Sequence, residues 1–372
     1  MPPEGPQEHG TSPTGRGGFG RGEPFAVVAR APGRVNLIGE HTDYNQGLAL
    51  PVAIDLETRV RFVPDASAQL RLTTSVDGAP ATVSVHPPPG PADVDAFAPQ
   101  WARLVAALVM QSHPARGGAV RITSTVPLGS GLSSSAALCV ALALALGVAG
   151  DPVATAELCR RAEAAAGLEV GLMDPLVSMA GQAGHGLVVD FADLGWELVP
   201  VPAGAELVVV HSGVERVLSS TGYPQRRAEC AAAARELGIP LGRAGPADLA
   251  GIADPTLRRR ARYVVAECAR VRSVAASLRN GDVTLAGEAM TESHWGQSED
   301  FEVSTPVVDR LVRDLSATPG VHGARLTGGG FGGCVVVLAE PGAVDAGRWP
   351  GRVTRVSPAR GASVDVEPRA QP

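Results

Sequence analysis

The sequence contains no lysine, so all 32 of its lysine-or-arginine positions are arginine. This absence excludes a phosphate loop built on lysine, a Schiff-base lysine and the strand lysine of protein kinases. The formal net charge is −6, so the chain has no basic excess with which to attract nucleic acid. We therefore expect no nucleic-acid partner.

Cysteine is also scarce, and long apolar runs are missing. The five cysteines are scattered and form no C-x-x-C pair, which argues against a disulfide scaffold or a zinc site and for reduced thiols in the cytoplasm. The longest apolar run, Ala136–Ala149, is shorter than the ~20 residues that span a bilayer. The N-terminus has no apolar stretch typical of a signal peptide. We expect no membrane partner and a cytoplasmic location.

The chain is long enough for two domains, with 372 residues of which 45% are hydrophobic. Residues 1–24 are rich in glycine, proline and polar residues and are expected to be disordered. We predict an N-terminal domain at 25–200 and a C-terminal domain at 201–357. The polar, proline-containing segment 358–372 is predicted to be a flexible tail.

Hydrophobic periodicity indicates both strands and helices. Expected strands are Val120–Thr125, Leu187–Phe191, Glu206–His211, Gly323–Thr327 and Gly333–Ala339, with a hairpin at Leu70–Val85. Expected helices are Trp101–Met110, Ala136–Leu146, Val153–Ala166, Tyr223–Leu237, Leu257–Arg279 and Thr305–Leu315. In the second half, the order strand, helix, helix, strand, strand is typical of an α+β domain.

The densest group of polar residues lies in the segment 30–45, which reads RAPGRVNLIGEHTDYN. Glu40, His41 and Asp43 can hydrogen-bond hydroxyl groups, and Arg34 can hold a carboxylate or a phosphate oxygen. Such a set suits a small polyhydroxyl substrate. Composition alone gives equal weight to a solvated turn between two strands.

A glycine- and serine-rich run, PLGSGLSSSAA, occupies 127–137 between a predicted strand and a predicted helix. Gly129 and Gly131 let backbone N–H groups approach an anion, and the helix N-terminus adds unpaired donors. The serines supply hydroxyls and a ligand for Mg²⁺. The run favours phosphate binding over a simple serine cap, because a cap needs only one serine.

A second glycine-rich run, 328–333, has the formal pattern G-x-G-x-x-G. A dinucleotide fingerprint must open a helix, whereas the following Cys334–Leu338 reads as a strand. We therefore expect these glycines to let the backbone pass close to another loop or a ligand. A plain hairpin turn is the alternative.

Asp174 is followed by Pro175, which is typical of a helix start with Asp174 as the N-cap and Pro175 as the first helical residue. A carboxylate at a helix N-terminus is stabilised as the anion. With an arginine beside it, such a carboxylate can orient a hydroxyl group and accept its proton.

Together, the segments 30–45, 127–136 and 327–334 resemble the motifs of the GHMP kinases, and the first resembles the signature of the galactokinase family within them. The resemblance covers roughly residues 25–340. It implies a two-domain α+β fold, with an N-terminal mixed-sheet domain of the ribosomal protein S5 domain 2-like type and a ferredoxin-like C-terminal domain.

The resemblance also implies a reaction. The γ-phosphoryl group of ATP would pass to the anomeric hydroxyl of D-galactose, giving galactose 1-phosphate and ADP, with Mg²⁺ as the cofactor. The protein would be a monomer or a weak homo-oligomer.

Residue roles follow from the matched motif positions. The catalytic positions are Asp174 and Arg34, and the sugar-binding positions are Glu40, His41, Asp43, Gly171 and Tyr223. The ATP-binding positions are Trp101, Pro127, Gly129, Ser130, Gly131, Leu132, Ser133, Ser134 and Ser135. The metal-binding positions are Ser135 and Glu163.

The chain departs from the galactokinase pattern near the site. Pro175 stands where glutamine is usual, and Arg216 where histidine is frequent. The segment from Glu163 to Asp174 is one residue shorter than usual, which makes Glu169 a second candidate for the metal. A kinase for N-acetylgalactosamine, galacturonate or arabinose, and a sensor that binds without turnover, are the alternatives. A NAD-dependent oxidoreductase is the least favoured of the alternative functions.

Overall fold

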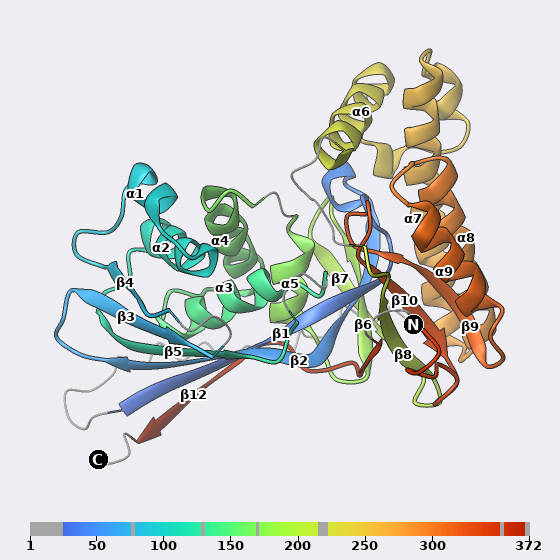
Figure 1. Ribbon diagram of the computed structural model, residues 1–372. Helices are drawn as coiled ribbons and strands as arrows, with labels where there is room; N and C mark the ends of the chain where they lie inside the picture. Colours follow the sequence, from blue (N-terminus) through green and yellow to red (C-terminus); the bar gives the residue numbers. More distant parts are fainter. Residues whose placement is uncertain are drawn as a thin grey trace, which may run out of the picture.

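The computed structural model describes residues 25–75, 79–127, 131–168, 171–214, 222–349 and 353–368 (Figure 1). The strands are β1 Phe25–Ile38, β2 Leu48–Pro64, β3 Gln69–Thr74, β4 Ala81–Ser84, β5 Gly118–Ser124, β6 His185–Asp190, β7 Gly195–Pro200, β8 Glu206–His211, β9 Val321–Thr327, β10 Cys334–Ala339, β11 Val353–Val356 and β12 Ser363–Pro368. The α-helices are α1 Pro91–Ala96, α2 Gln100–Ser112, α3 Ser134–Ala145, α4 Pro152–Ala165, α5 Met173–Ala180, α6 Gly222–Leu237, α7 Pro255–Arg279, α8 Val283–Glu299 and α9 Pro306–Ser316. Short 3-10 helices occupy Asp43–Asn45, Leu241–Arg243 and Asp248–Gly251.

Within the described residues, one sheet of eight strands has the order β12-β1-β2-β5-β3-β4, and β6 and β7 extend from β2. The sheet is mixed, because β3 runs parallel to β5 while the other strand pairs of the sheet are antiparallel. The helices α1 to α4 lie on one side of it (Figure 1). The predicted mixed sheet is therefore confirmed.

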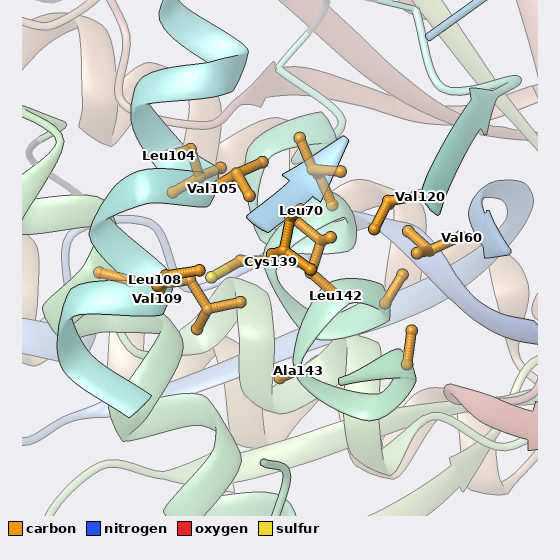
Figure 2. Close-up of a cluster of buried hydrophobic side chains, with 14 of the residues drawn as sticks. Val60, Leu70, Leu104, Val105, Leu108, Val109, Val120, Cys139, Leu142 and Ala143 are labelled. Atoms are coloured by element: carbon orange, nitrogen blue, oxygen red, sulfur yellow. The ribbon is translucent and has the colours of Figure 1, made fainter. Parts of the chain in front are cut away.

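A core of aliphatic side chains fills the space between this sheet and its helices (Figure 2). Leu104 and Leu108 of α2 and Cys139 and Leu142 of α3 lie around Leu70 of β3 in this core. The helix α3 is buried on nearly all sides, and Cys139 and Leu142 have no exposed surface. The core therefore fixes the N-terminal end of α3, where the serine-rich run lies.

The C-terminal strand β12 corrects one prediction. Residues 363–368 pair antiparallel with β1, from Phe25 opposite Pro368 to Arg30 opposite Ser363. The chain before β12 also pairs with the sheet, since Ala359 N–H donates to the carbonyl of Ala53 at 2.8 Å. The predicted flexible tail is therefore wrong for residues 358–368. Composition misled because β12 is itself an edge strand, held by backbone pairing to β1 while its side chains stay largely exposed.

A second sheet has the order β11-β8-β10-β9 and is antiparallel throughout. Both faces of its central strands are buried. Val209 and Val336 face a core shared with β1 and β2, whereas Val210 and Val337 face a core shared with α6 and α9. Burial on both faces explains the unbroken apolar runs in β8 and β10.

The predicted elements are present, with small shifts at their ends, but α8 at Val283–Glu299 was missed. Its buried positions include Ser293, His294 and Gln297, so the helix has no clear apolar stripe in the sequence. Among the described residues, no helix is both long and apolar enough to cross a membrane.

Candidate active site

Arg34 and Asp174 form the centre of the site. Nε of Arg34 donates to Oδ1 of Asp174 at 2.8 Å, and Nη2 donates to Oδ2 at 2.7 Å. Such a two-pronged pair fixes the plane of the carboxylate as well as its charge. The third nitrogen of Arg34, Nη1, donates to the carbonyl of Gly131 at 2.7 Å. The sequence prediction that an arginine accompanies Asp174 is confirmed in its geometry.

Asp174 is not the N-cap of its helix, as the sequence analysis predicted. The helix α5 begins at Met173 with Leu172 as the N-cap. The backbone N–H of Leu176 donates to the carbonyl of Leu172 at 3.2 Å. Pro175 fits in this first turn, because the N–H that it lacks would have no partner within the helix. The carboxylate of Asp174 is therefore directed to Arg34 instead of capping the helix.

The serine-rich run meets the same carboxylate. The Ser133 hydroxyl donates a hydrogen bond to Oδ2 of Asp174 and does not cap α3, although Ser133 is the residue before that helix. Ser133 has a left-handed backbone, with φ of 63°. Backbone N–H of Arg34 donates to the carbonyl of Leu132 at 3.1 Å. The run is thus tied to β1 on one side and to α5 on the other.

Glu163 of α4 supplies an unusual carboxylate beside this centre. Its side chain has no exposed surface, and neither carboxylate oxygen accepts a hydrogen bond of good geometry among the described residues, although the Ser135 hydroxyl is close enough to lower its pKa. Burial raises its pKa to about 8, and the charge of Asp174 adds to this effect, while Ser135 and Arg34 oppose it. A buried carboxylate without a donor is costly unless a cation is bound beside it.

These residues fit a magnesium ion. Mg²⁺ in proteins takes one or two carboxylates and completes its shell with substrate phosphates and water. Glu163 and the Ser135 hydroxyl can supply the protein's share. The described residues contain no group of three histidine, cysteine or acidic side chains placed to hold a metal by themselves, so the phosphates of a bound nucleotide would be needed.

Asp43 and Gly171 are in direct contact. A Cβ atom placed on Gly171 would lie 1.9 Å from Oδ2 of Asp43. Any residue other than glycine at this position would therefore clash with the carboxylate of Asp43. The pKa of Asp43 is raised to about 6, mainly by burial and in smaller part by the charge of Asp174, while a hydrogen bond from the backbone of Tyr44 and the charge of Arg227 act in the opposite direction. The electrostatic coupling with Asp174 places Asp43 on the same side of the site.

His41 and Tyr223 belong to a cluster of rings. The His41 ring lies 5.4 Å from the Tyr223 ring and 4.8 Å from the Phe301 ring, measured between centroids. Nδ1 of His41 shares a hydrogen bond of 2.9 Å with the Tyr44 hydroxyl. Because α6 begins at Gly222, this cluster fixes the start of that helix against the 30–45 segment.

Glu40 lies where the segment after β1 meets β9 of the second sheet. Its Oε1 accepts from the backbone N–H of Gly328 at 2.9 Å and from the Thr327 hydroxyl at 3.1 Å. Its Oε2 is ion-paired with Arg325 of β9. The second glycine-rich run therefore does approach another loop closely, as the sequence predicted, and β10 follows it as a strand.

The remaining predicted residues have fewer contacts with the Arg34–Asp174 pair. Trp101 lies at the start of α2, packed against the N-terminal core. Within the described residues, no hydrogen bond or ion pair joins it to Asp174. Pro127 follows β5, and Ser134 is the first residue of α3. Four positions named above lie outside the described residues: Gly129, Ser130, Glu169 and Arg216.

The partners of Glu40 were not predicted from the sequence. Arg325 and Glu267 are fully buried and paired with each other, with Nη2 and Oε1 3.2 Å apart. A signal for Arg325 was present, since a charged residue stood inside an apolar strand immediately before the glycine run. Glu267 gave no such signal, because it lies in a helix with many charged residues.

Comparison with known families agrees with the fold. The model of the GHMP kinase N-terminal domain matches residues 101–182, and the model of the C-terminal domain matches residues 274–348. A mevalonate kinase structure superposes with a TM-score of 0.64 at 17% identity, over 89% of this chain and 98% of the other. The fold and the two matched domain models thus define a GHMP kinase.

A model described as the galactokinase galactose-binding signature matches residues 17–63. The human galactokinase is 42% identical over 336 residues, covering 86% of this chain and 85% of the relative. The Mycobacterium tuberculosis galactokinase is 40% identical over 326 residues, covering 84% and 89%. A Lactococcus lactis galactokinase structure with galactose has a TM-score of 0.82 at 25% identity, covering 91% and 95%. The chain belongs to the galactokinase family, as the sequence predicted.

Proposed function

We propose that this protein is a galactokinase, which transfers the γ-phosphoryl group of ATP to the anomeric hydroxyl of D-galactose and yields galactose 1-phosphate and ADP. The observation that carries the proposal is the fixed Arg34–Asp174 pair beside the serine-rich turn, in a chain with the galactokinase signature. The pair brings a carboxylate and a cation together where a hydroxyl and a phosphoryl group would meet.

Asp174 is the proposed proton acceptor. Phosphoryl transfer depends mainly on positioning and on neutralising charge, so this carboxylate needs only to orient the anomeric hydroxyl and take its proton late in the transfer. Arg34 and Ser133 hold both carboxylate oxygens, which leaves Asp174 one preferred orientation. Arg34 also neutralises charge on the transferring group.

ATP is proposed to lie along the serine-rich turn, with its phosphates at the N-terminal end of α3. Unpaired N–H groups and the positive end of the helix dipole favour an anion there. Trp101 and the residues 127–135 are the proposed nucleotide contacts. With no lysine in the chain, charge on the phosphates must be met by backbone dipoles, arginine and metal.

Glu163 and Ser135 are the proposed protein ligands of Mg²⁺. When bound with ATP, the ion neutralises phosphate oxygens and supplies electrostatic stabilisation of the developing charge. Glu163 projects from α4 and Ser135 from the first turn of α3, so the packing of the two helices sets the distance between the ligands.

The sugar contacts are proposed to be Glu40, His41, Asp43, Gly171 and Tyr223. Carboxylates that accept hydrogen bonds from hydroxyls reject analogues that lack them, by up to ~10⁴-fold. Asp43 is coupled electrostatically to Asp174, which supports a position close to the reacting hydroxyl.

We propose that the protein is a monomer or a weak homo-oligomer. The five cysteines are all buried and none forms a disulfide, which supports the proposed cytoplasmic location.

The test is an ADP-release assay with Mg-ATP and each of galactose, N-acetylgalactosamine, galacturonate, arabinose and glucose, with Asp174→Asn as the comparison. We expect turnover with galactose that Asp174→Asn lowers by at least ~10²-fold. Turnover with another sugar alone would make the protein a different sugar 1-kinase. Saturable galactose binding without turnover would make it a sensor and would contradict the proposal.

A further inference from the structure

Ser133 is connected to three elements of the site at once. It immediately precedes α3, and its hydroxyl donates to Oδ2 of Asp174 in α5. Its neighbour Leu132 ties it to β1, because the Leu132 carbonyl accepts from the backbone N–H of Arg34 at 3.1 Å. Ser133 and Asp174 are both partly exposed, so a ligand in the site can reach both side chains.

The backbone of Ser133 has a conformation that residues other than glycine seldom adopt. Its φ and ψ are 63° and 46°, in the left-handed region, where a side chain crowds the backbone. Serine is among the best residues for capping a helix, yet the Ser133 side chain makes no capping hydrogen bond to α3. A strained backbone and a missing cap thus accompany one interaction, the hydrogen bond to Asp174, which indicates a functional reason for it.

The carboxylate of Asp174 has little acceptor capacity left. A carboxylate offers about four acceptor positions, two on each oxygen. Arg34 takes one position on each oxygen, at 2.8 and 2.7 Å, and Ser133 takes the second position on Oδ2. A sugar hydroxyl that is to give its proton to Oδ2 must therefore displace Ser133.

A bound nucleotide would offer the Ser133 hydroxyl a different partner. Ala137 N–H donates to the Ser133 carbonyl at 3.0 Å, and the N–H groups that precede Ala137 have no partner within the helix. Phosphates at these donors, as proposed above, would lie beside the Ser133 side chain. A serine hydroxyl carries a single proton and donates to one acceptor at a time. Because Arg34 already neutralises Asp174, the more highly charged phosphate is the stronger acceptor for that proton.

We propose that Ser133 couples nucleotide binding to the readiness of Asp174. Without nucleotide, the Ser133 hydroxyl occupies Oδ2. When phosphates bind, the hydroxyl rotates to a phosphate oxygen and leaves Oδ2 free to accept the anomeric hydroxyl of the sugar. Arg34 keeps both of its bonds, so the carboxylate stays in place while one acceptor position opens. The inference rests on the proposed function, because it takes Asp174 as the proton acceptor and the serine-rich turn as the nucleotide site.

This coupling has a definite sign. Nucleotide and sugar strengthen each other's binding, by the same factor in both directions. Removal of the Ser133 hydroxyl should therefore strengthen sugar binding in the absence of nucleotide, because Oδ2 is then already free. The alternative is that Ser133 only orients Asp174, in which case its removal weakens sugar binding with and without nucleotide.

The experiment measures the Kd for galactose by titration calorimetry, without nucleotide and with a saturating concentration of the Mg²⁺ complex of the non-hydrolysable analogue β,γ-imido-ATP. The coupling ratio is the first Kd divided by the second. In the wild-type protein we expect a ratio of about ten, the effect of one additional hydrogen bond to a charged group. Where galactose alone binds too weakly to measure, the Kd of the nucleotide analogue without and with galactose gives the same ratio.

Two variants remove the hydroxyl and one serves as the control. Ser133→Ala should lower the Kd for galactose without nucleotide by about tenfold and bring the coupling ratio to within about twofold of one. Ser133→Gly should do the same, and glycine adopts the left-handed backbone without strain, so this variant decides the question if the alanine variant does not fold. Ser134→Ala is the matched control, since Ser134 is the next residue and, among the described residues, makes no hydrogen bond with Asp174. It should leave the coupling ratio as in the wild type, whatever its effect on affinity for the analogue.

Weaker galactose binding by the Ser133 variants with and without nucleotide, at an unchanged coupling ratio, would show that Ser133 only orients the carboxylate and would overturn the proposal. A wild-type ratio close to one would do the same, while galactose turnover by the wild type would leave the proposed function standing. A wild-type protein that neither binds nor phosphorylates galactose would instead remove the proposed function on which the inference rests.

Discussion

Arg34 and Asp174 lie 140 positions apart in the chain, yet two nitrogens of one meet two oxygens of the other at 2.8 and 2.7 Å. The first residue comes from β1 and the second from the opening turn of α5. Packing of α3 and α5 against β1 and β2 holds these two elements in place. The chemistry proposed above depends on this geometry more than on the charge alone.

Arg34→Lys tests that dependence. Lysine keeps the positive charge but loses the planar fork and cannot reach Asp174 and the Gly131 carbonyl together. We expect kcat to fall by about 10²-fold, with a smaller change in the KM for galactose. The ADP-release assay measures both, and a kcat within about twofold of the wild type would show that charge suffices.

Gly171→Ala should weaken sugar binding. The added Cβ would lie 1.9 Å from Oδ2 of Asp43, so the carboxylate must move. We expect the KM for galactose to rise about tenfold while the KM for ATP is unchanged. Gly204→Ala is the control, since a Cβ there has no neighbour within 4 Å. Equal KM values for galactose in Gly171→Ala and the wild type would place Asp43 outside the sugar site.

The pH dependence of galactose binding should report Asp43. Its folded pKa of about 6 lies above the ordinary value of 3.8, so the group takes up a proton as the pH falls through 6. If the ionised form accepts the sugar hydroxyl, kcat/KM for galactose should fall with a slope approaching tenfold per pH unit below that point. Asp43→Asn should flatten this limb, and an unchanged limb in the variant would assign the titration to another group.

The raised pKa of Asp43 also makes the free energy of unfolding depend on pH. Between pH 3.8 and about 6 the folded protein binds more protons at Asp43 than the unfolded chain does. The contribution of this group to the free energy of unfolding therefore decreases as the pH rises through that window. Denaturant titrations should show a smaller decrease across it for Asp43→Asn than for the wild type.

Glu163→Gln should raise the concentration of Mg²⁺ needed for activity. The substitution keeps the shape of the side chain but removes the charge that a cation would offset. We expect the half-saturating Mg²⁺ concentration to rise by at least about tenfold at fixed ATP. Glu157→Gln is the control on the same helix, where Glu157 is ion-paired with Arg160. Equal Mg²⁺ curves for Glu163→Gln and the wild type would remove Glu163 from the metal site.

Much of the site could be predicted from the sequence because its residues lie in short runs with distinctive composition. Arg34 stood in a dense polar segment, and Asp174 stood beside a proline. Their meeting could not be derived from spacing, because it is set by the packing of α5 against β1. The N-cap prediction for Asp174 failed for the same reason, since a tertiary partner took the carboxylate.

The parts that the sequence did not predict share a physical cause. The helix α8 buries Ser293 and His294, and Glu267 of α7 is buried among donors, so polarity misled where hydrogen bonds replaced apolar contact. The strand β12 is held mainly by backbone pairing, which leaves no apolar pattern. Sequence patterns report apolar burial well and polar burial poorly.

The most direct test of the central claim is the identity of the product. Wild-type protein with Mg-ATP and galactose would be followed by phosphorus NMR with coupling to protons. A phosphate monoester coupled to the anomeric proton of galactose, formed with ADP in equal amount, is the predicted result. A phosphate on another hydroxyl, or no sugar phosphate under conditions where galactose binds, would contradict it.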